Sequence, residues 1–279
     1  MTLVEKAAWK LYRLAHCRLW TRRTLCRLKR SRAPFSEELA RSTEDALRRD
    51  ASLPPEEAGR LERIETVRSE LARSEECITL FGETVPVAKM GTGSSKSRNW
   101  ALLLYHLLRR FRPTSCVELG TCLGLSGAYQ AAALKSNGAG RLVTIEGSDD
   151  AAAIARETTF ARAGLGDIAE VVAGRFQDVL PDVLQRRAPV DYAFIDGHHE
   201  QDATLAYFDQ LLPHLSAPAL LVFDDIRWSD GMTAAWRQIQ RHPRVRLAVD
   251  FVMMGVCVVG APRADEEHPN AAHFKMALW

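Results

Sequence analysis

The second half of the chain alternates between short apolar runs and longer helix-prone segments. The apolar runs cover residues 116–119, 142–145, 169–173, 190–195 and 219–223, and helical patterns cover 149–163, 178–187, 201–215 and 231–242. Strands that alternate with helices in this way form a parallel sheet with helices on both faces. Two further runs, 245–253 and 255–259, have little between them and predict a hairpin with an antiparallel strand. We therefore expect an α/β fold with a doubly wound, mostly parallel, seven-stranded sheet.

The first third of the chain has a different pattern, which predicts helices. Residues 1–32 are rich in Lys and Arg against the single acid Glu5, and Trp9, Tyr12 and Trp20 recur among them at roughly helical spacing. We interpret this segment as a helix that packs on the rest of the protein or on a second subunit. An anionic membrane surface or a nucleic acid is the alternative partner.

Further helices are expected over residues 56–77 and 98–111, with a loop and a short strand over 78–97. The polar end of that loop, residues 90–97, is either a lid over a pocket or an ordinary linker. The chain then divides into a helical N-terminal extension (1–89), the α/β domain (90–262) and a C-terminal tail (263–279) whose structure the pattern does not predict.

Composition excludes several classes of protein. The 279 residues are 47% apolar with a net charge of +2, which is ordinary for a globular protein and points to no nucleic acid. The six cysteines include no C-x-x-C pair, so we expect free thiols in a reducing compartment. No 18-residue uncharged apolar run and no signal peptide are present, so we expect a cytoplasmic protein without a transmembrane segment.

A glycine-rich turn follows the first apolar run of the α/β domain. Gly120, Gly124 and Gly127 do not have the G-x-G-x-x-G spacing that cradles a pyrophosphate, and Glu118 would repel one. Glu146 ends the next apolar run, where a carboxylate can accept hydrogen bonds from both hydroxyls of a ribose. A nucleoside with a positive charge nearby, such as S-adenosylmethionine with its ammonium and sulfonium groups, fits this combination.

Polar residues also end the later strands of the predicted sheet. They are Gly174 with Arg175, Asp196, and Asp224 with Asp225. Ligands of doubly wound sheets bind at the carboxyl ends of the strands, so we expect one convergent site. Three carboxylates brought together repel one another unless a cation neutralises them, and Mg²⁺ prefers such oxygen ligands. Alternatively, Asp224 caps the following segment and Asp225 faces solvent.

His198 and His199 follow the fourth strand. A histidine can accept a proton from a hydroxyl group at neutral pH, so either could act as a general base. Of the two, His199 is the candidate that we favour.

These residues resemble the class I S-adenosylmethionine-dependent methyltransferases, in particular the catechol O-methyltransferase-like, small-molecule branch. The resemblance covers about residues 90–260 and implies a Rossmann-like methyltransferase fold. It implies that Glu118 to Ser126, with Gly120, Thr121 and Cys122 between them, surround the methionine portion of the cofactor. Glu146 matches the acid that binds the ribose, and Gly174, Phe176 and Gln177 match the segment that lines the adenine.

The resemblance also implies roles for the acids of the later strands. Asp196, Asp224 and Asp225 fall at the metal-ligand positions of the metal-dependent members, and Asp196 also lies beside the cofactor. His199 falls where the catechol enzymes carry a lysine base. Because His replaces Lys and Asp replaces Asn at one ligand position, the pattern departs from the family at two places.

We therefore expect an S-adenosylmethionine-dependent O-methyltransferase that acts on a small hydroxylated metabolite, with Mg²⁺ or another divalent cation as a further cofactor. We also expect a homo-oligomer. N-methylation, a nicotinamide-dependent oxidoreductase and a non-catalytic binding protein with the same fold are the alternatives.

Overall fold

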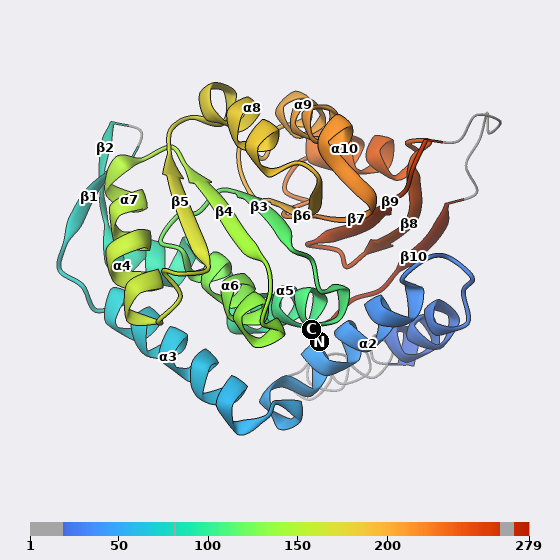
Figure 1. Cartoon of the computed structure of the whole chain (residues 1–279), viewed down its shortest axis with the longest axis horizontal. Coiled ribbons are helices and arrows are strands. Elements are labelled where there is room, and N and C mark those ends of the chain that lie inside the picture. Colours follow the sequence, from blue (N-terminus) through green and yellow to red (C-terminus); the bar gives the residue numbers. More distant parts are fainter. Residues whose placement is uncertain (1–18, 81, 263–270, 279) are drawn as a thin grey trace, which may run out of the picture.

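The computed structural model describes residues 19–80, 82–262 and 271–278, in which a mixed sheet of eight strands forms the centre of the molecule (Figure 1). The strand order is β10-β8-β9-β7-β6-β3-β4-β5, and β9 alone runs antiparallel to its neighbours. The strands are β3 (Ser115–Leu119), β4 (Arg141–Glu146), β5 (Ala169–Ala173), β6 (Val190–Ile195), β7 (Leu215–Phe223), β8 (Val245–Asp250), β9 (Gly255–Val259) and β10 (Ala272–Lys275). The predicted doubly wound fold and its antiparallel hairpin are confirmed.

Successive side chains of a strand point to opposite faces of the sheet. Because these strands carry apolar residues at consecutive positions, both faces of the sheet are apolar. In β3, Val117 and Leu119 contact one core, while Cys116 belongs to the other. The first core lies under α8 (Phe176–Arg187), α9 (Gln201–Leu211) and α10 (Asp230–Gln240), which cover the upper face in Figure 1. The opposite face is covered by α2 (Ser36–Arg48), α3 (Pro55–Leu71), α5 (Arg98–Phe111), α6 (Leu125–Asn137) and α7 (Asp149–Ile154) with its extension Ala155–Phe160.

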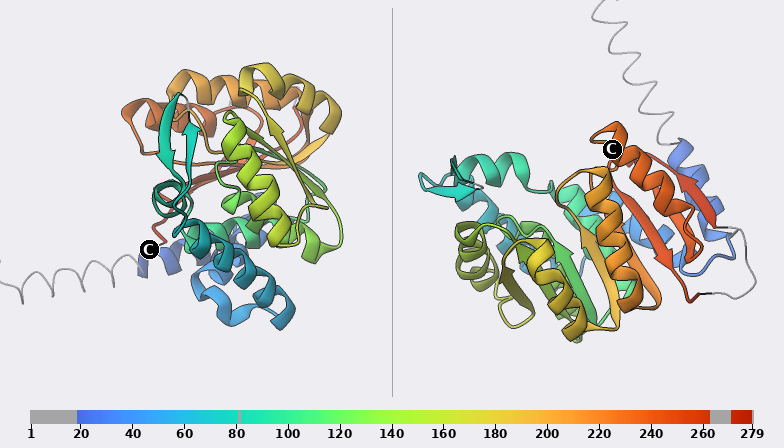
Figure 2. Two further views of the ribbon diagram at one scale, coloured as in Figure 1. Left: turned by 90° about the vertical axis from the view of Figure 1, so that its left-hand side faces the viewer. Right: turned by 90° about the horizontal axis from the view of Figure 1, so that it is seen from above.

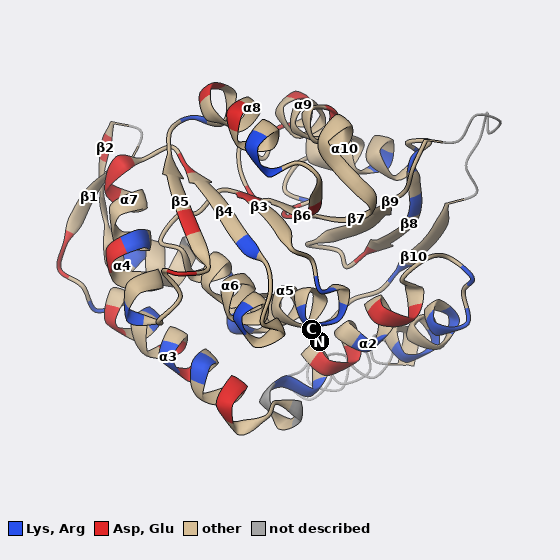
Figure 3. Ribbon diagram, viewed as in Figure 1, with Lys and Arg blue, Asp and Glu red and all other residues tan. Residues whose placement is uncertain are grey.

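The N-terminal helices are joined to the α/β domain by polar contacts as well as by the core. Arg109 of α5 donates to Glu57 of α3 at 2.6 Å, and Arg60 of α3 donates to Ser136 of α6 at 2.5 Å. Acidic and basic residues are interspersed along α3 (Figure 3). These helices therefore form one layer of the domain.

A small hairpin of β1 (Cys77–Leu80) and β2 (Glu83–Pro86) follows α3 and lies at the end of the molecule opposite to β10 (Figure 2). The backbone N–H of Thr79 donates to Asp150 at 2.8 Å, and its carbonyl accepts from Ser148 at 2.8 Å. The hairpin is thereby held against the start of α7. The short helix α4 (Val87–Lys89) and a π-helical turn (Met90–Ser94) then lead to α5.

The residues near the two ends of the described chain lie together. Residues 19–29 form a helical segment, and the Thr21 hydroxyl donates to the carbonyl of Ala277 at 2.5 Å. Leu25, Leu28 and Met276 are buried in the same core. The predicted residues Trp9 and Tyr12 of this segment lie outside the described residues.

Three regions differ from the sequence-based expectation. After α3, which ends at Leu71 and not at residue 77, two strands and the short helix α4 form where a loop with one short strand was expected. Helix α2 forms where only a segment of mixed charge was expected, and β10 adds an eighth strand beside β8 within the predicted C-terminal tail. Among the described residues, no helix is long and apolar enough to cross a membrane.

Candidate functional site

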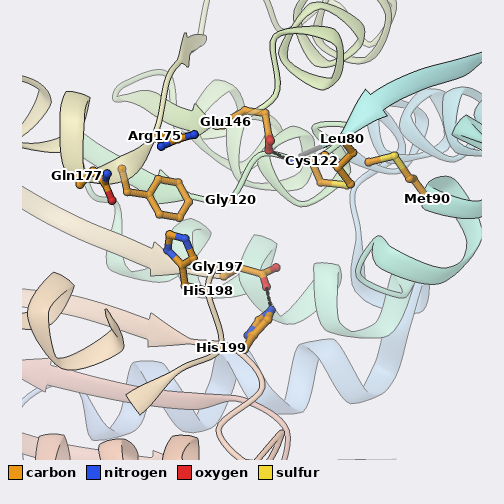
Figure 4. Close-up of a pocket in the computed structure, with 13 residues that line it drawn as sticks. Leu80, Met90, Gly120, Cys122, Glu146, Arg175, Gln177, Gly197, His198 and His199 are labelled. Atoms are coloured by element: carbon orange, nitrogen blue, oxygen red, sulfur yellow. Dashed lines mark hydrogen bonds and ion pairs between the residues drawn. The ribbon is translucent and has the colours of Figure 1, made fainter. Parts of the chain in front are cut away.

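A cavity of about 510 Å³ opens at the carboxyl ends of the central strands (Figure 4). It lies beside the ends of β3, β4 and β6 and also touches the N-terminal segment through Leu80 and Met90. Its lining residues are Leu80, Met90, Gly120, Cys122, Glu146, Gly147, Arg175, Phe176, Gln177, Asp196, Gly197, His198 and His199. Six of the residues that the sequence predicts for the cofactor line it: Gly120, Cys122, Glu146, Phe176, Gln177 and Asp196.

Gly120 allows β3 and β6 to approach closely at this end of the sheet. Its φ is +104°, and a Cβ atom there would lie 2.0 Å from the backbone oxygen of Asp196. No other residue type fits this place without a shift of the backbone. The cavity floor beside Asp196 therefore depends on the glycine.

Glu146 presents a fixed carboxylate to the cavity. Its Oε2 atom accepts from the backbone N–H of Cys122 at 2.7 Å, and its Oε1 atom accepts from that of Ser148 at 3.0 Å. Burial raises the pKa of this carboxyl group, and the backbone hydrogen bonds oppose that rise. Because a carboxylate has about four acceptor sites, two remain for a pair of ligand hydroxyl groups.

Phe176 forms an apolar wall across the cavity. Its ring packs edge-on against His198 and against Tyr207, each at 5.5 Å between centroids. The Nδ1 atom of His198 is hydrogen-bonded to the Tyr207 hydroxyl. Phe176 and Tyr207 together therefore fix the position of the His198 ring.

Four predicted cofactor residues lie outside the cavity wall. Glu118 belongs to β3 and is fully buried, and it accepts hydrogen bonds from Ser126 at 2.8 Å and Thr144 at 2.7 Å. Burial raises the pKa of Glu118 to about 7. Thr121 is hydrogen-bonded to Thr144 at 2.6 Å, and a Cβ atom at Gly174 would meet Val179. In this structure Glu118, Thr121, Ser126 and Gly174 do not line the cavity.

His199 lies between two carboxylates. Its Nε2 atom is 3.8 Å from Oδ1 of Asp196 and 3.9 Å from Oδ2 of Asp225. The other ring nitrogen, Nδ1, is buried without a hydrogen-bond partner. Trp228 lies beside it at 6.0 Å between ring centroids, and that indole is 69% exposed.

The three predicted metal ligands come together, but not in an arrangement that fits a metal ion. The ammonium of Lys96 pairs with Oδ2 of Asp224 and lies 3.7 Å from Oδ2 of Asp196. Burial raises the pKa of Asp196, and the nearby Lys96 and His199 oppose this rise. Within the described residues, no group of three or more His, Cys, Asp or Glu side chains could hold a metal ion. The predicted Mg²⁺ site is therefore absent from this arrangement, because Lys96 lies among its oxygen atoms.

The sequence analysis missed Leu80, Met90 and Lys96 as residues of the site. Leu80 and Met90 belong to segments outside the alternating strand pattern, and only the polar loop over residues 90–97 was a signal. Lys96 ends that loop, and the loop faces the site. Arg175 was recognised only as a residue at a strand end.

Comparison with known proteins points to one activity. Residues 117–226 match a protein family described as "Methyltransferase domain". The chain is 33% identical over 154 residues to a catechol O-methyltransferase of Niastella koreensis, a match that covers 54% of this chain and 67% of that protein.

Solved structures share the fold. An O-methyltransferase from Bacillus cereus in complex with SAH has a TM-score of 0.56 at 23% identity, over 76% of this chain and 94% of that one. The O-methyltransferase TomG from Streptomyces achromogenes, involved in tomaymycin synthesis and bound to SAM, has a TM-score of 0.55 at 22% identity, over 73% and 90%. At these identities the likeness supports the fold alone.

Proposed function

The chain belongs to the catechol O-methyltransferase-like family of S-adenosylmethionine-dependent O-methyltransferases, and on that premise we propose that its cavity binds the cofactor beside a small hydroxylated acceptor. One observation carries this proposal. The same cavity is lined by Glu146, whose carboxylate can bind ribose hydroxyls, and by His199, which can act as a base.

The lining residues fit the parts of S-adenosylmethionine. Glu146 has acceptor sites left for the two ribose hydroxyls, and Gly120 lines the cavity where the methionine portion would lie. Phe176 and Gln177 would flank the adenine, with the ring of Phe176 as an apolar surface. When bound, the cofactor supplies a methyl group on a positively charged sulfur.

The acceptor would lie on the side of the cavity with His199. Methyl transfer is an in-line displacement, so the protein's main task is to align the acceptor oxygen at a near-attack distance. Nε2 of His199 would accept the hydroxyl proton, and Asp196 and Asp225 would stabilise the imidazolium that forms. Asp196 therefore has an electrostatic role in this proposal.

Family membership favours methyl transfer over hydride transfer, and thus over the nicotinamide-dependent alternative. N-methylation stays open as a variant of the same reaction. A catechol is the first acceptor to test, since the relative from Niastella koreensis carries that name.

Calorimetry tests the cofactor assignment directly. We expect S-adenosylmethionine and S-adenosylhomocysteine to bind in a one-to-one ratio and NAD not to bind. Transfer of a labelled methyl group to a catechol oxygen would then identify the reaction. Binding of NAD without binding of S-adenosylmethionine would contradict the proposal.

We also propose that the protein is a homo-oligomer that uses the helical segment over residues 19–29. Leu19 and Trp20 are exposed there, and Arg22, Arg23 and Arg27 of the same segment cluster with Arg30, which follows it. Light scattering of the full chain and of the Trp20→Ser variant tests this assembly. A monomer in both cases would contradict it.

A further inference from the structure

The methyl-transfer proposal gives no role to Lys96, the lysine that lies among Asp196, Asp224 and Asp225. It lies between the π-helical turn and α5, 128 residues before its partner Asp224 in the sequence. The Lys96 side chain is 15% exposed and that of Asp224 is 3% exposed, so the pair is largely removed from water. An ion pair of this kind is electrostatically stronger than one on the surface.

The three acids are all paired with basic groups of the protein. Asp196 faces Lys96 through Oδ2 and His199 through Oδ1, whereas Asp224 faces Lys96 and Asp225 faces His199. Lys96 and His199 therefore lie on opposite sides of Asp196. A divalent ion bound to Asp196 and Asp224 would have to displace the ammonium from the same oxygen atoms.

An ammonium can replace a divalent ion in its electrostatic role. Buried carboxylates need a nearby cation because they repel one another and lose their hydration. The lysine ammonium is a compact charge with three donor hydrogens and no acceptor, so it satisfies carboxylate oxygens but cannot itself bind a metal ion. It is covalently attached, and no free cation has to be recruited from solution.

We propose that Lys96 is a built-in cation of this site, which takes the place of the divalent metal and holds Asp196 and Asp224 together. Lys96 is thus a positioning residue, and the wild-type protein works without a divalent ion. This inference rests on the proposed function only in placing the acceptor beside these acids. The assignment of the cation itself depends on the contacts of Lys96 alone.

Titration with Mn²⁺, followed by calorimetry and by electron paramagnetic resonance, tests the inference without any methyl transfer. We expect no saturable Mn²⁺ site in the wild-type protein. Lys96→Met removes the charge and keeps most of the side chain's volume, so this variant should gain one saturable site. The double variant Lys96→Met with Asp224→Asn should lose that site again. Lys89→Met, at an exposed lysine ahead of the same loop, is the matched control and should behave as wild type.

Two results would overturn the inference. One is a saturable Mn²⁺ site in the wild-type protein that disappears in Asp224→Asn, since the metal would then displace Lys96. The other is a Lys96→Met variant that is folded by circular dichroism and binds no Mn²⁺, since the cluster would then be no cation site. If Lys96→Met does not fold, Lys96→Gln replaces it, and the wild-type titration still decides. Calorimetry with S-adenosylmethionine on the wild type separates a failure of the proposed function from a failure of this inference.

Discussion

The carboxylate of Glu146 joins the end of β4 to the turn after β3, because its Oε2 atom accepts the backbone N–H of Cys122 at 2.7 Å. One side chain thus fixes the glycine-rich turn and also faces the cavity. We expect Glu146→Gln to weaken S-adenosylmethionine binding by about 1–3 kcal/mol, the usual loss for hydrogen bonds to a charged group. Calorimetry measures this change.

Glu118→Gln is the matched control for that experiment. Glu118 is a more deeply buried acid of the neighbouring strand, and it accepts hydrogen bonds from Ser126, Gln130 and Thr144. The affinity for S-adenosylmethionine should therefore stay near the wild-type value. Equal losses in the two variants would mean that Glu118 reaches the cofactor after all.

His199→Ala should lower turnover with a catechol by about 10²–10⁴-fold, the usual effect of removing a positioned general base. Cofactor affinity should hardly change, because His199 lies on the acceptor side. His198→Ala should instead affect the KM for the cofactor, since His198 packs on Phe176 and Tyr207. Steady-state kinetics and cofactor titration separate the two effects. If both variants show the same mild loss of turnover, His199 is not the base.

Gly120→Ala should destabilise the protein and block the cofactor. The new methyl group would lie 2.0 Å from the backbone oxygen of Asp196, and the positive φ adds strain of about 1–3 kcal/mol. Gly138→Ala is the control: its φ is +71°, yet nothing lies within 4 Å of the added atom. Thermal unfolding should show a larger loss for Gly120→Ala. Equal losses would mean that backbone strain alone matters.

His106 should make the protein less stable in mild acid. It is 5% exposed in α5, and burial lowers its pKa to about 4. The nearby charges contribute smaller effects of both signs: carboxylates raise the pKa and guanidinium groups lower it. Between about pH 6.5 and pH 4 the unfolded chain therefore binds the extra proton, so stability falls as the pH falls. The total effect is about 3 kcal/mol.

His106→Phe removes this proton-binding group and keeps an aromatic ring in the core. Urea unfolding at pH 7 and pH 5 should give a smaller loss of stability for the variant than for the wild type. The comparison is needed because Glu118, Glu146 and Asp196 have raised pKa values and act in the opposite direction. If the wild type and the variant lose the same stability between pH 7 and pH 5, the prediction is wrong.

The sequence predicted what depends on local periodicity. The central strands and their order of alternation with helices follow from apolar runs, and the ends of parallel strands lie at one edge of the sheet. Glu146, Asp196 and His199 were found in this way. Helix α2 was missed, although Leu39, Thr43 and Ala46 form a buried stripe at helical spacing between its charged residues.

The remaining differences concern contacts that local pattern does not determine. Glu118 was expected beside the cofactor, and in the structure it is fully buried and does not line the cavity. Lys96 was missed because its partner lies 128 residues later, where only the folded chain brings the two together. β10 has only four residues, and its place depends on pairing with β8.

The contact between Thr21 and Ala277 bears on how the protein is made. Their separation of 256 residues means that ribosomes finish the helical segment over residues 19–29 long before Ala277 exists. During synthesis the apolar side of that segment, with Leu25 and Leu28, lacks Met276 as its cover. Contacts so distant in sequence form late, because a long loop must close first. The apolar side of this segment therefore gains its last cover, Met276, only when almost the whole chain has been made.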